Sequence, residues 1–267
     1  MNTHSRTLFP HPSTEQPAAP PARPLPQYSL RRIVGTWAAA ALPMAALAWV
    51  VAPEIASSFE GPSAWPRAVI LTLTMGLTWQ FALVLALVRR EQGSLRWSVL
   101  KDALWLHRPQ SPRTGRSGGR LWWLLVPLTL AVAAKEMLPK LPMPAARDLG
   151  AFLESDAGHS FLSGNWGWFT LIITMFAMNT VLGEELLFRG LLLPRMQGVF
   201  GRGDWLANAV LFAGYHLHVP WMIPQVLVSG SLYAYPARRY RSAVMGMAVH
   251  SVQSVIFGVL VLVLVLG

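Results

Sequence analysis

Long runs of apolar residues, separated by short polar or proline-containing segments, follow one another from residue 33 to the end of the chain. Several runs approach the roughly 20 residues that an α-helix needs to cross a bilayer. Seven stretches can be distinguished: residues 33–52, 68–88, 121–134, 166–193, 205–217, 221–235 and 243–266. The third, fifth and sixth are short, so we expect them to be tilted and buried among the others, or longer than their hydropathy indicates. The pattern predicts an all-α, polytopic transmembrane helix bundle with about seven spans.

The composition agrees with a membrane protein. Of the 267 residues, 53% are hydrophobic and only 13% are charged, whereas soluble globular proteins average about 25% charged residues. The chain has no cysteine, which excludes disulfides, thiolate catalysis and cysteine-ligated zinc or iron–sulfur sites.

The net charge of +10 would suggest a nucleic-acid partner in a soluble protein, but the positions of the basic residues favour another explanation. With the N-terminus placed in the cytoplasm, the cytoplasmic segments hold 18 of the 22 Lys and Arg residues, while the 12 acidic residues divide equally between the two sides. This is the positive-inside asymmetry of membrane proteins. We therefore predict a cytoplasmic N-terminus, an external C-terminus, a lipid bilayer around the helices and no nucleic-acid partner.

Three regions are expected. Residues 1–28 contain seven prolines and almost no apolar periodicity, which is typical of a disordered cytoplasmic tail. Residues 29–160 hold the first predicted transmembrane helices and a basic cytoplasmic loop, in which residues 95–106 have amphipathic character. That segment either lies in the membrane interface with its basic face toward anionic lipid or forms a solvated helical hairpin. Residues 161–267 hold the remaining helices and the polar motifs.

Two adjacent glutamates, Glu184 and Glu185, lie inside the apolar stretch 166–193. A carboxylate in hydrocarbon costs roughly 2.5–3.5 kcal/mol even on a lenient insertion scale, so an intramembrane cluster of ionisable residues indicates a functional site. Arg189 follows Glu185 by four residues, so the two can pair on one helix face and lower the cost of burying both. Glu184 then points about 100° away and is left for other chemistry. The alternative is a Glu–Arg pair solvated at a cytoplasmic helix end.

Two later apolar stretches carry histidines with a helical i, i+4 partner. Phe212 and His216 form a Phe-x-x-x-His motif, and Asn208 lies one turn earlier on the same face. His250 and Ser254 share a face of the last stretch, where the hydroxyl could orient the imidazole. Each motif also has a structural interpretation, because a backbone carbonyl can satisfy a histidine at a helix end and polar residues can join transmembrane helices by hydrogen bonds.

The three motifs lie at similar depths below the expected cytoplasmic surface. At about 1.5 Å per residue, Glu184 is roughly 15 Å, His216 roughly 18 Å and His250 roughly 13–14 Å from that surface. Independent placement would not be expected to produce this agreement, so we expect one common site. His218 is nearer the external end, and we interpret it as a structural residue.

In this order on successive helices, the motifs Glu-Glu-x-x-x-Arg, Phe-x-x-x-His and His-x-x-x-Ser resemble those of the CPBP family of intramembrane proteases. That family includes the CAAX prenyl endopeptidases and the bacterial Abi-type bacteriocin-immunity proteins. The resemblance covers about residues 166–267. It implies that Glu184, His216 and His250 activate water for peptide hydrolysis, with Glu185 and Arg189 as supporting catalytic residues. Support of the substrate or of the oxyanion is expected from three further residues: Phe212, Asn208 and Ser254, the last standing where the family usually has Asn.

The residues leave the mechanism open. A carboxylate buried among helices can act as a general base on water, and two histidines can polarise the scissile carbonyl and stabilise the oxyanion. The same set, Glu184, His216 and His250, could instead hold one divalent metal ion such as zinc with an open water position. The zinc-helix pattern His-Glu-x-x-His does not occur in the sequence.

We therefore predict an intramembrane endopeptidase of the CAAX type that cleaves a membrane-anchored or lipidated protein or peptide, within a multi-pass protein of a bacterial plasma (inner) membrane. One alternative is a non-catalytic membrane scaffold or bacteriocin-immunity protein of the same fold. A second is a rhomboid-type serine protease that would use Ser229 or Ser231 with His250. A third, a transporter, is weakened because the sequence contains no inverted repeat.

Overall fold

The computed structural model describes residues 25–138 and 141–267. Helices make up nearly all of its regular structure, and within these two ranges the only β-type pairing is an isolated bridge between Gln110 and Ser117. The predicted all-α class is therefore confirmed. Residues 1–24 of the proposed cytoplasmic tail lie outside the described part of the chain, so that tail stays a prediction.

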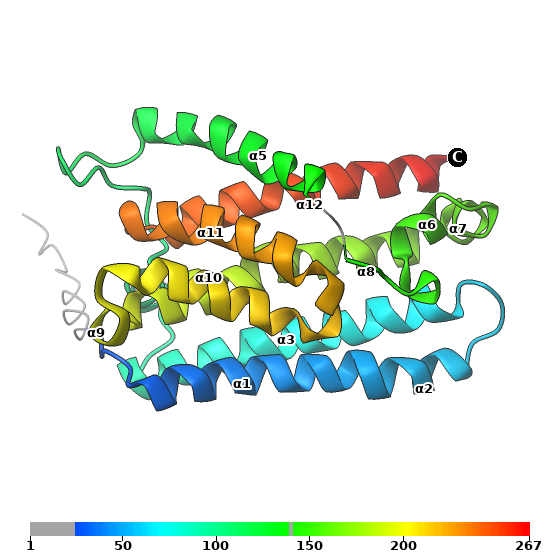
Figure 1. Ribbon diagram of the computed structural model, residues 1–267, viewed down its shortest axis with the longest axis horizontal. Coiled ribbons are helices and arrows are strands. Elements are labelled where there is room, and N and C mark those ends of the chain that lie inside the picture. The colour runs from blue at the N-terminus through cyan, green and yellow to red at the C-terminus, as the bar shows by residue number, and fades with distance from the viewer. Residues whose placement is uncertain (1–24, 139–140) are drawn as a thin grey trace, which may run out of the picture.

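In the described part of the chain, four continuous helical rods are long and apolar enough to cross a membrane. The first joins α1 (Leu30–Ala46) through a short π-helical segment to α2 (Ala52–Ser57), and α3 (Ala64–Gln92) packs beside it. The third rod begins with α8 (Trp166–Ala177) and continues through two π-helical segments, and the fourth is α12 (Ala243–Leu266). Figure 1 shows all four running roughly along the long axis of the molecule.

Three shorter helices lie at the remaining predicted stretches: α5 (Leu125–Ala134), α10 (Asp204–Tyr215) and α11 (Ile223–Arg239). They have 10, 12 and 17 residues, fewer than the roughly 20 that cross a bilayer. In Figure 1, α10 and α11 lie side by side and α5 lies along one edge of the bundle against α12. Helices thus occupy all seven expected places, while the number of spans and the cytoplasmic N-terminus stay predictions.

The basic loop after α3 packs against the helices. Its only α-helix among the described residues is α4 (Trp97–Ala103). Arg195, at the end of the third rod, donates to the Ala103 carbonyl at 3.0 Å, and the Ala243 N–H that begins α12 donates to the Trp105 carbonyl at 2.9 Å. Within the amphipathic segment 95–106, the α-helix therefore covers Trp97–Ala103, and contacts with other helices hold the residues at its C-terminal end. Whether the segment lies in the membrane interface stays a prediction.

Local sequence explains where the main rods begin and end. Ser29 precedes α1, and its hydroxyl accepts from the Arg32 N–H at 3.4 Å. Ser242 caps α12 in the same way, accepting from the Met245 N–H at 3.3 Å. α3 ends at Gln92, and the capping residue Gly93 has a φ of 72°, in the left-handed region that glycine adopts without strain. Three shorter helices complete the α-helices of the described residues: α6 (Leu149–Leu153), α7 (Asp156–Leu162) and α9 (Gln197–Phe200).

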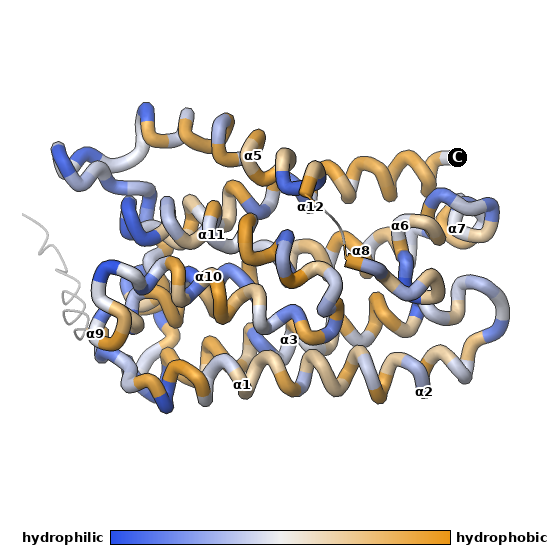
Figure 2. The backbone as a smooth tube through the Cα atoms, viewed as in Figure 1, coloured by the Kyte–Doolittle hydropathy of each residue, from blue (hydrophilic) through white to orange (hydrophobic). Residues whose placement is uncertain are grey.

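The surface of the bundle is apolar along its length and polar at its ends. Figure 2 shows hydrophobic residues along the middle of the rods and hydrophilic residues gathered at both ends. The outer face of α12 exposes large apolar side chains: Val255, Ile256, Phe257, Val259, Leu260 and Val263. A contiguous apolar face of this kind suits hydrocarbon better than water. The arrangement therefore supports a helix bundle that is surrounded by lipid.

Candidate active site

The centre of the third rod carries three buried charged residues. Glu185 and Arg189 are both fully buried, and Glu184 is only 3% exposed. Glu185 Oε1 lies 2.9 Å from an Arg189 terminal nitrogen, so the two pair along one helix face as their spacing predicts. The Arg189 guanidinium also donates to the Gly230 carbonyl of α11 at 3.1 Å. Pairing lowers the cost of burying both charges and ties the motif to a neighbouring helix.

Glu184 points away from that pair, toward α10. Its Oε1 lies 3.9 Å from Nε2 of His216. With the Asn179 amide oriented to satisfy its hydrogen bonds, Asn179 Nδ2 donates to both Glu184 oxygens at 2.9 and 3.1 Å. Asn179 precedes Glu184 by five residues and lies in a π-helical segment (Met178–Gly183), whose i, i+5 repeat brings such residues to one side. The π segment thus positions an amide beneath the carboxylate.

The His216 ring is held with one nitrogen toward Glu184. Nδ1 lies 2.9 Å from the Phe212 carbonyl oxygen, which can only accept, so we assign the hydrogen to Nδ1. In the neutral ring, Nε2 is then an acceptor that faces the carboxylate. Phe212 packs edge-on against this ring at 4.9 Å between centroids, and His218 stacks on it at 5.2 Å. These neighbours fix the plane of the imidazole.

The second histidine approaches the other glutamate. His250 Nδ1 lies 3.1 Å from Glu185 Oε1. Its ring stacks on Tyr233 of α11 with centroids 4.7 Å apart and an angle of 16° between the planes. The two glutamates therefore divide the histidines between them, Glu184 facing His216 and Glu185 facing His250. This leaves Nε2 of His250 as the nitrogen that does not contact Glu185.

The three residues expected to support substrate differ in their positions. Phe212 lies between the motifs, with the Arg189 guanidinium 4.1 Å from its ring centroid. Asn208 has a structural contact, because its amide donates to the Phe188 carbonyl at 2.8 Å. Ser254 lies one turn after His250 and is half-buried, and in the described part of the chain no hydrogen bond joins it to the imidazole. Roles for these three in binding substrate stay predictions.

Two glycines allow this close packing. A Cβ at Gly246 of α12 would lie 2.8 Å from Glu185 Oε2, and a Cβ at Gly230 of α11 would lie 2.9 Å from the Phe212 ring. Real Cβ atoms essentially never come so close, so glycine at these two positions lets α12 approach the Glu185 carboxylate and α11 approach the Phe212 ring. By contrast, a Cβ at Gly214 would meet Trp37 at an ordinary 3.7 Å.

Sequence reasoning missed several residues of the site. Gln80 of α3 is fully buried and donates to the Tyr215 hydroxyl, which interacts with Glu184. Asn179 and Gln80 had a visible signal, since each is a polar residue inside an apolar stretch. For Tyr215 and His218, the only signal in the sequence was that they lie within two residues of His216. The interpretation of His218 as a residue near a helix end did not anticipate that it stacks on the His216 ring.

A polar cluster anchors the end of the motif helix. Arg195 is fully buried, and its Nε donates to Glu91 Oε2 at 3.0 Å. Glu91 also pairs with Arg32 at 2.5 Å and accepts from the Tyr28 hydroxyl. Tyr28 lies before the first rod, and burial together with the neighbouring carboxylate raises the pKa of its hydroxyl above the ordinary value. Residues far apart in sequence thus fix the end of the rod, three residues beyond its last π segment.

The donor geometry does not favour a metal ion held by the predicted three ligands. Within residues 25–138 and 141–267, no group of three or more His, Cys, Asp and Glu side chains is arranged to hold one. His250 directs Nδ1 to Glu185, while Glu184 Oε1 lies 3.9 Å from His216 Nε2. We therefore derive no step through a metal, and the zinc set of Glu184, His216 and His250 stays a prediction.

The serine alternative also lacks support from the geometry. The Ser229 hydroxyl lies 3.3 Å from the Gln225 and Val226 carbonyls of its own helix, and the Ser231 hydroxyl donates to the Leu227 carbonyl at 2.8 Å. Neither is a hydroxyl held by an imidazole, as a serine nucleophile requires.

Comparison with known proteins gives one match. Residues 166–256 match the model of the family described as type II CAAX prenyl endopeptidase Rce1-like. No curated protein and no solved structure matches the chain. The matched range covers about a third of the sequence and contains all three motifs, and it supports an assignment to the CAAX protease family. Together with the four apolar rods, it indicates an integral membrane protein of a protease family.

Proposed function

We propose that this protein is an intramembrane endopeptidase of the CAAX type, which cleaves a membrane-anchored or lipidated protein or peptide with water activated by Glu184. The observation that carries the proposal is the position of the Glu184 carboxylate, 3% exposed inside the bundle and 3.9 Å from His216 Nε2. That separation exceeds a direct hydrogen bond and suits a water shared by the two groups. A desolvated carboxylate beside an imidazole acceptor can act as a general base that removes a proton from water.

The reaction follows from the groups around that position. Glu184 takes a proton from water as the water oxygen bonds to the scissile carbonyl carbon, while His216 Nε2 accepts a hydrogen bond from the remaining O–H. The C–N bond of the tetrahedral intermediate then breaks, and the proton held by Glu184 passes to the leaving nitrogen. The products are a new carboxyl end and a new amine, so atoms and charges balance.

Glu185 acts as a positioning residue in this scheme. Its Oε1 contacts both Arg189 at 2.9 Å and His250 at 3.1 Å, so it fixes the His250 ring relative to the motif helix. His250 Nε2 then faces away from Glu185, and when the ring carries both protons it can donate to the oxyanion. Asn179 holds the Glu184 carboxylate from the opposite side.

Cleavage of a defined anchored peptide tests this function. The full-length chain is reconstituted in liposomes with a peptide that carries a farnesylated cysteine followed by three residues, and with a palmitoylated peptide of the same sequence. Mass spectrometry identifies the new C-terminus. We expect one internal cut near the anchor. The proposal is contradicted if the wild-type protein is folded and inserted but cuts neither peptide faster than Glu184→Gln does. Full biological activity of the Glu184→Ala/His216→Ala variant would favour the scaffold alternative instead.

We further propose that the protein resides in a bacterial plasma membrane with its N-terminus in the cytoplasm. The excess of Lys and Arg on one side of the predicted spans supports this orientation.

A further inference from the structure

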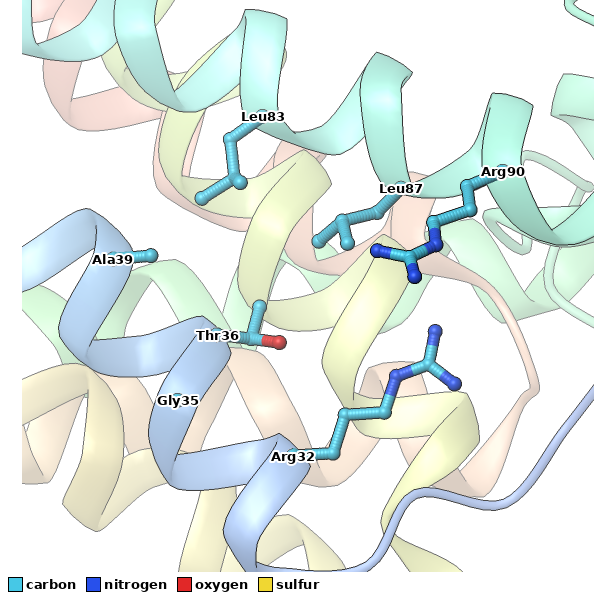
Figure 3. A pocket seen from close by; sticks show the side chains of 7 residues that line it. All are labelled: Arg32, Gly35, Thr36, Ala39, Leu83, Leu87 and Arg90. Atoms are coloured by element: carbon cyan, nitrogen blue, oxygen red, sulfur yellow. The ribbon is translucent and has the colours of Figure 1, made fainter.

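A cavity of about 530 Å³ lies between α1 and α3, outside the residues of the candidate active site. Its walls are mostly apolar and come from Gly35 and Ala39 on α1 and Leu83 and Leu87 on α3 (Figure 3). The volume is within the roughly 300–1,000 Å³ of small-molecule sites. From its polar end to Ala39 the α1 wall is about 10 Å long at 1.5 Å per residue. The cavity is thus an elongated apolar groove between two membrane-spanning rods.

Two arginines stand together at one end of this groove. Figure 3 shows the guanidinium groups of Arg32 and Arg90 directed toward one another across the opening. Arg32 shares Glu91 with the buried Arg195, and among the described residues Arg90 has no carboxylate partner. Glu91 therefore pairs with two guanidinium groups while the third, that of Arg90, has no carboxylate in the described ranges, and the mouth of the groove keeps an excess of positive charge. Two like charges facing one opening are stabilised by an anion placed between them.

We propose that this groove binds an anionic phospholipid, with an acyl chain against Leu83, Leu87 and Ala39 and the phosphate between Arg32 and Arg90. The two arginines lie where α1 begins and α3 ends, and the apolar groove runs from there along both helices. A ligand with an anionic head and an apolar chain fits both parts. Headgroup phosphates lie where apolar membrane helices end, and basic pockets between such helices bind anionic headgroups. A soluble phosphate satisfies the arginines alone and leaves the apolar groove without an occupant.

Gly35 and Arg89 supply variants that separate the parts of the site. Gly35 lines the groove and a Cβ there would meet no atom within 4 Å, so Gly35→Leu is chosen to occupy the groove with a larger side chain. Arg89 neighbours Arg90, but its guanidinium donates to the Gly93 carbonyl of its own helix end and it does not line the groove. Arg89→Gln therefore removes the same charge from the same helix and serves as the matched control for Arg90→Gln.

The experiment is a titration of the full-length chain in detergent with phosphatidylglycerol and with phosphatidylcholine of identical acyl chains, followed by native mass spectrometry. We expect the wild-type chain to prefer phosphatidylglycerol. Arg90→Gln should reduce that preference about fivefold and Arg32→Gln/Arg90→Gln about thirtyfold, with Arg89→Gln within about twofold of wild type. Gly35→Leu should weaken binding of both lipids, and glycerol 3-phosphate should not compete at lipid concentrations that saturate the site.

Each other outcome overturns the proposal. Equal effects of Arg90→Gln and Arg89→Gln would mean that net charge, and not this site, attracts the lipid. Unchanged lipid binding by Gly35→Leu, or full competition by glycerol 3-phosphate, would make the arginine pair a site for a soluble anion only. Because these variants leave Glu184, His216 and His250 in place, peptide cleavage is measured separately and its loss does not bear on the lipid site.

Discussion

The Nδ1 atom of His250 lies 3.1 Å from Oε1 of Glu185, the same oxygen that faces Arg189 at 2.9 Å. One buried carboxylate therefore joins α12 to the motif helix, although 65 residues separate the two in sequence. Arg189 in turn donates to the Gly230 carbonyl, which brings in α11. The motif Glu-Glu-x-x-x-Arg thus has two functions in one segment: Glu184 faces the second motif, and Glu185 holds the third.

Breaking the Glu185–Arg189 pair should destabilise the protein strongly. Both side chains are fully buried, and removing one partner of a buried ion pair leaves the other charge uncompensated at a cost of about 3–5 kcal/mol. We expect Glu185→Gln to lower the unfolding temperature in detergent well below that of Glu54→Gln, a control at an exposed position on α2. The double variant Glu185→Leu/Arg189→Met should lose less than the two single variants together. Additive losses would contradict the coupling.

His250 should matter for turnover and a surface histidine should not. His250→Asn removes the ring that contacts Glu185 and stacks on Tyr233, whereas His159→Asn changes an exposed residue of α7. We expect His250→Asn to lower kcat for an anchored peptide by roughly 10²-fold or more, as for loss of an acid–base or oxyanion group. A His250→Asn protein that is folded and retains the kcat of His159→Asn would remove His250 from the mechanism.

A single methyl group at Gly246 should disturb the site. The added Cβ would lie 2.8 Å from Glu185 Oε2 and 3.3 Å from Arg189 Cγ, so the pair or α12 must shift. Overpacking of this kind costs about 1–3 kcal/mol. The matched variant Gly214→Ala meets only an ordinary contact and should gain about 0.5–1 kcal/mol from the lower entropy of the unfolded chain. Thermal unfolding of both proteins checks the contrast, and equal shifts would contradict it.

Much of this arrangement follows from local sequence rules. The four-residue spacing of Glu185 and Arg189 predicts their pairing, because helix geometry alone fixes it. The similar depths of Glu184, His216 and His250 predict that they lie near one another, since depth depends only on helix rise and on where each stretch ends. The all-α class follows from long apolar runs. Each of these inferences uses distances along one helix.

What the sequence could not predict depends on how helices rotate and pack against one another. Rotation of α10 and α12 decides that His216 faces Glu184 while His250 faces Glu185, and depth gives no information about rotation. The π-helical turn that brings Asn179 to Glu184 is a departure from the 3.6-residue repeat on which the prediction relied. The amphipathic character of residues 95–106 did not give the bounds of α4, which ends at Ala103; the carbonyls of Ala103 and Trp105 accept from Arg195 and Ala243, contacts that local periodicity cannot predict.

The rate of peptide cleavage by Glu184→Gln tests the central claim most directly. The amide has nearly the size and shape of the carboxylate but cannot take a proton from water, so the chemistry is lost while the packing is kept. In liposomes containing equal amounts of folded protein, we predict that Glu184→Gln cleaves an anchored peptide roughly 10²–10⁴-fold more slowly than the wild type, while Glu154→Gln, at an exposed position after α6, cleaves at the wild-type rate. Cleavage by Glu184→Gln within about twofold of the wild-type rate would contradict the assignment of Glu184 as the base.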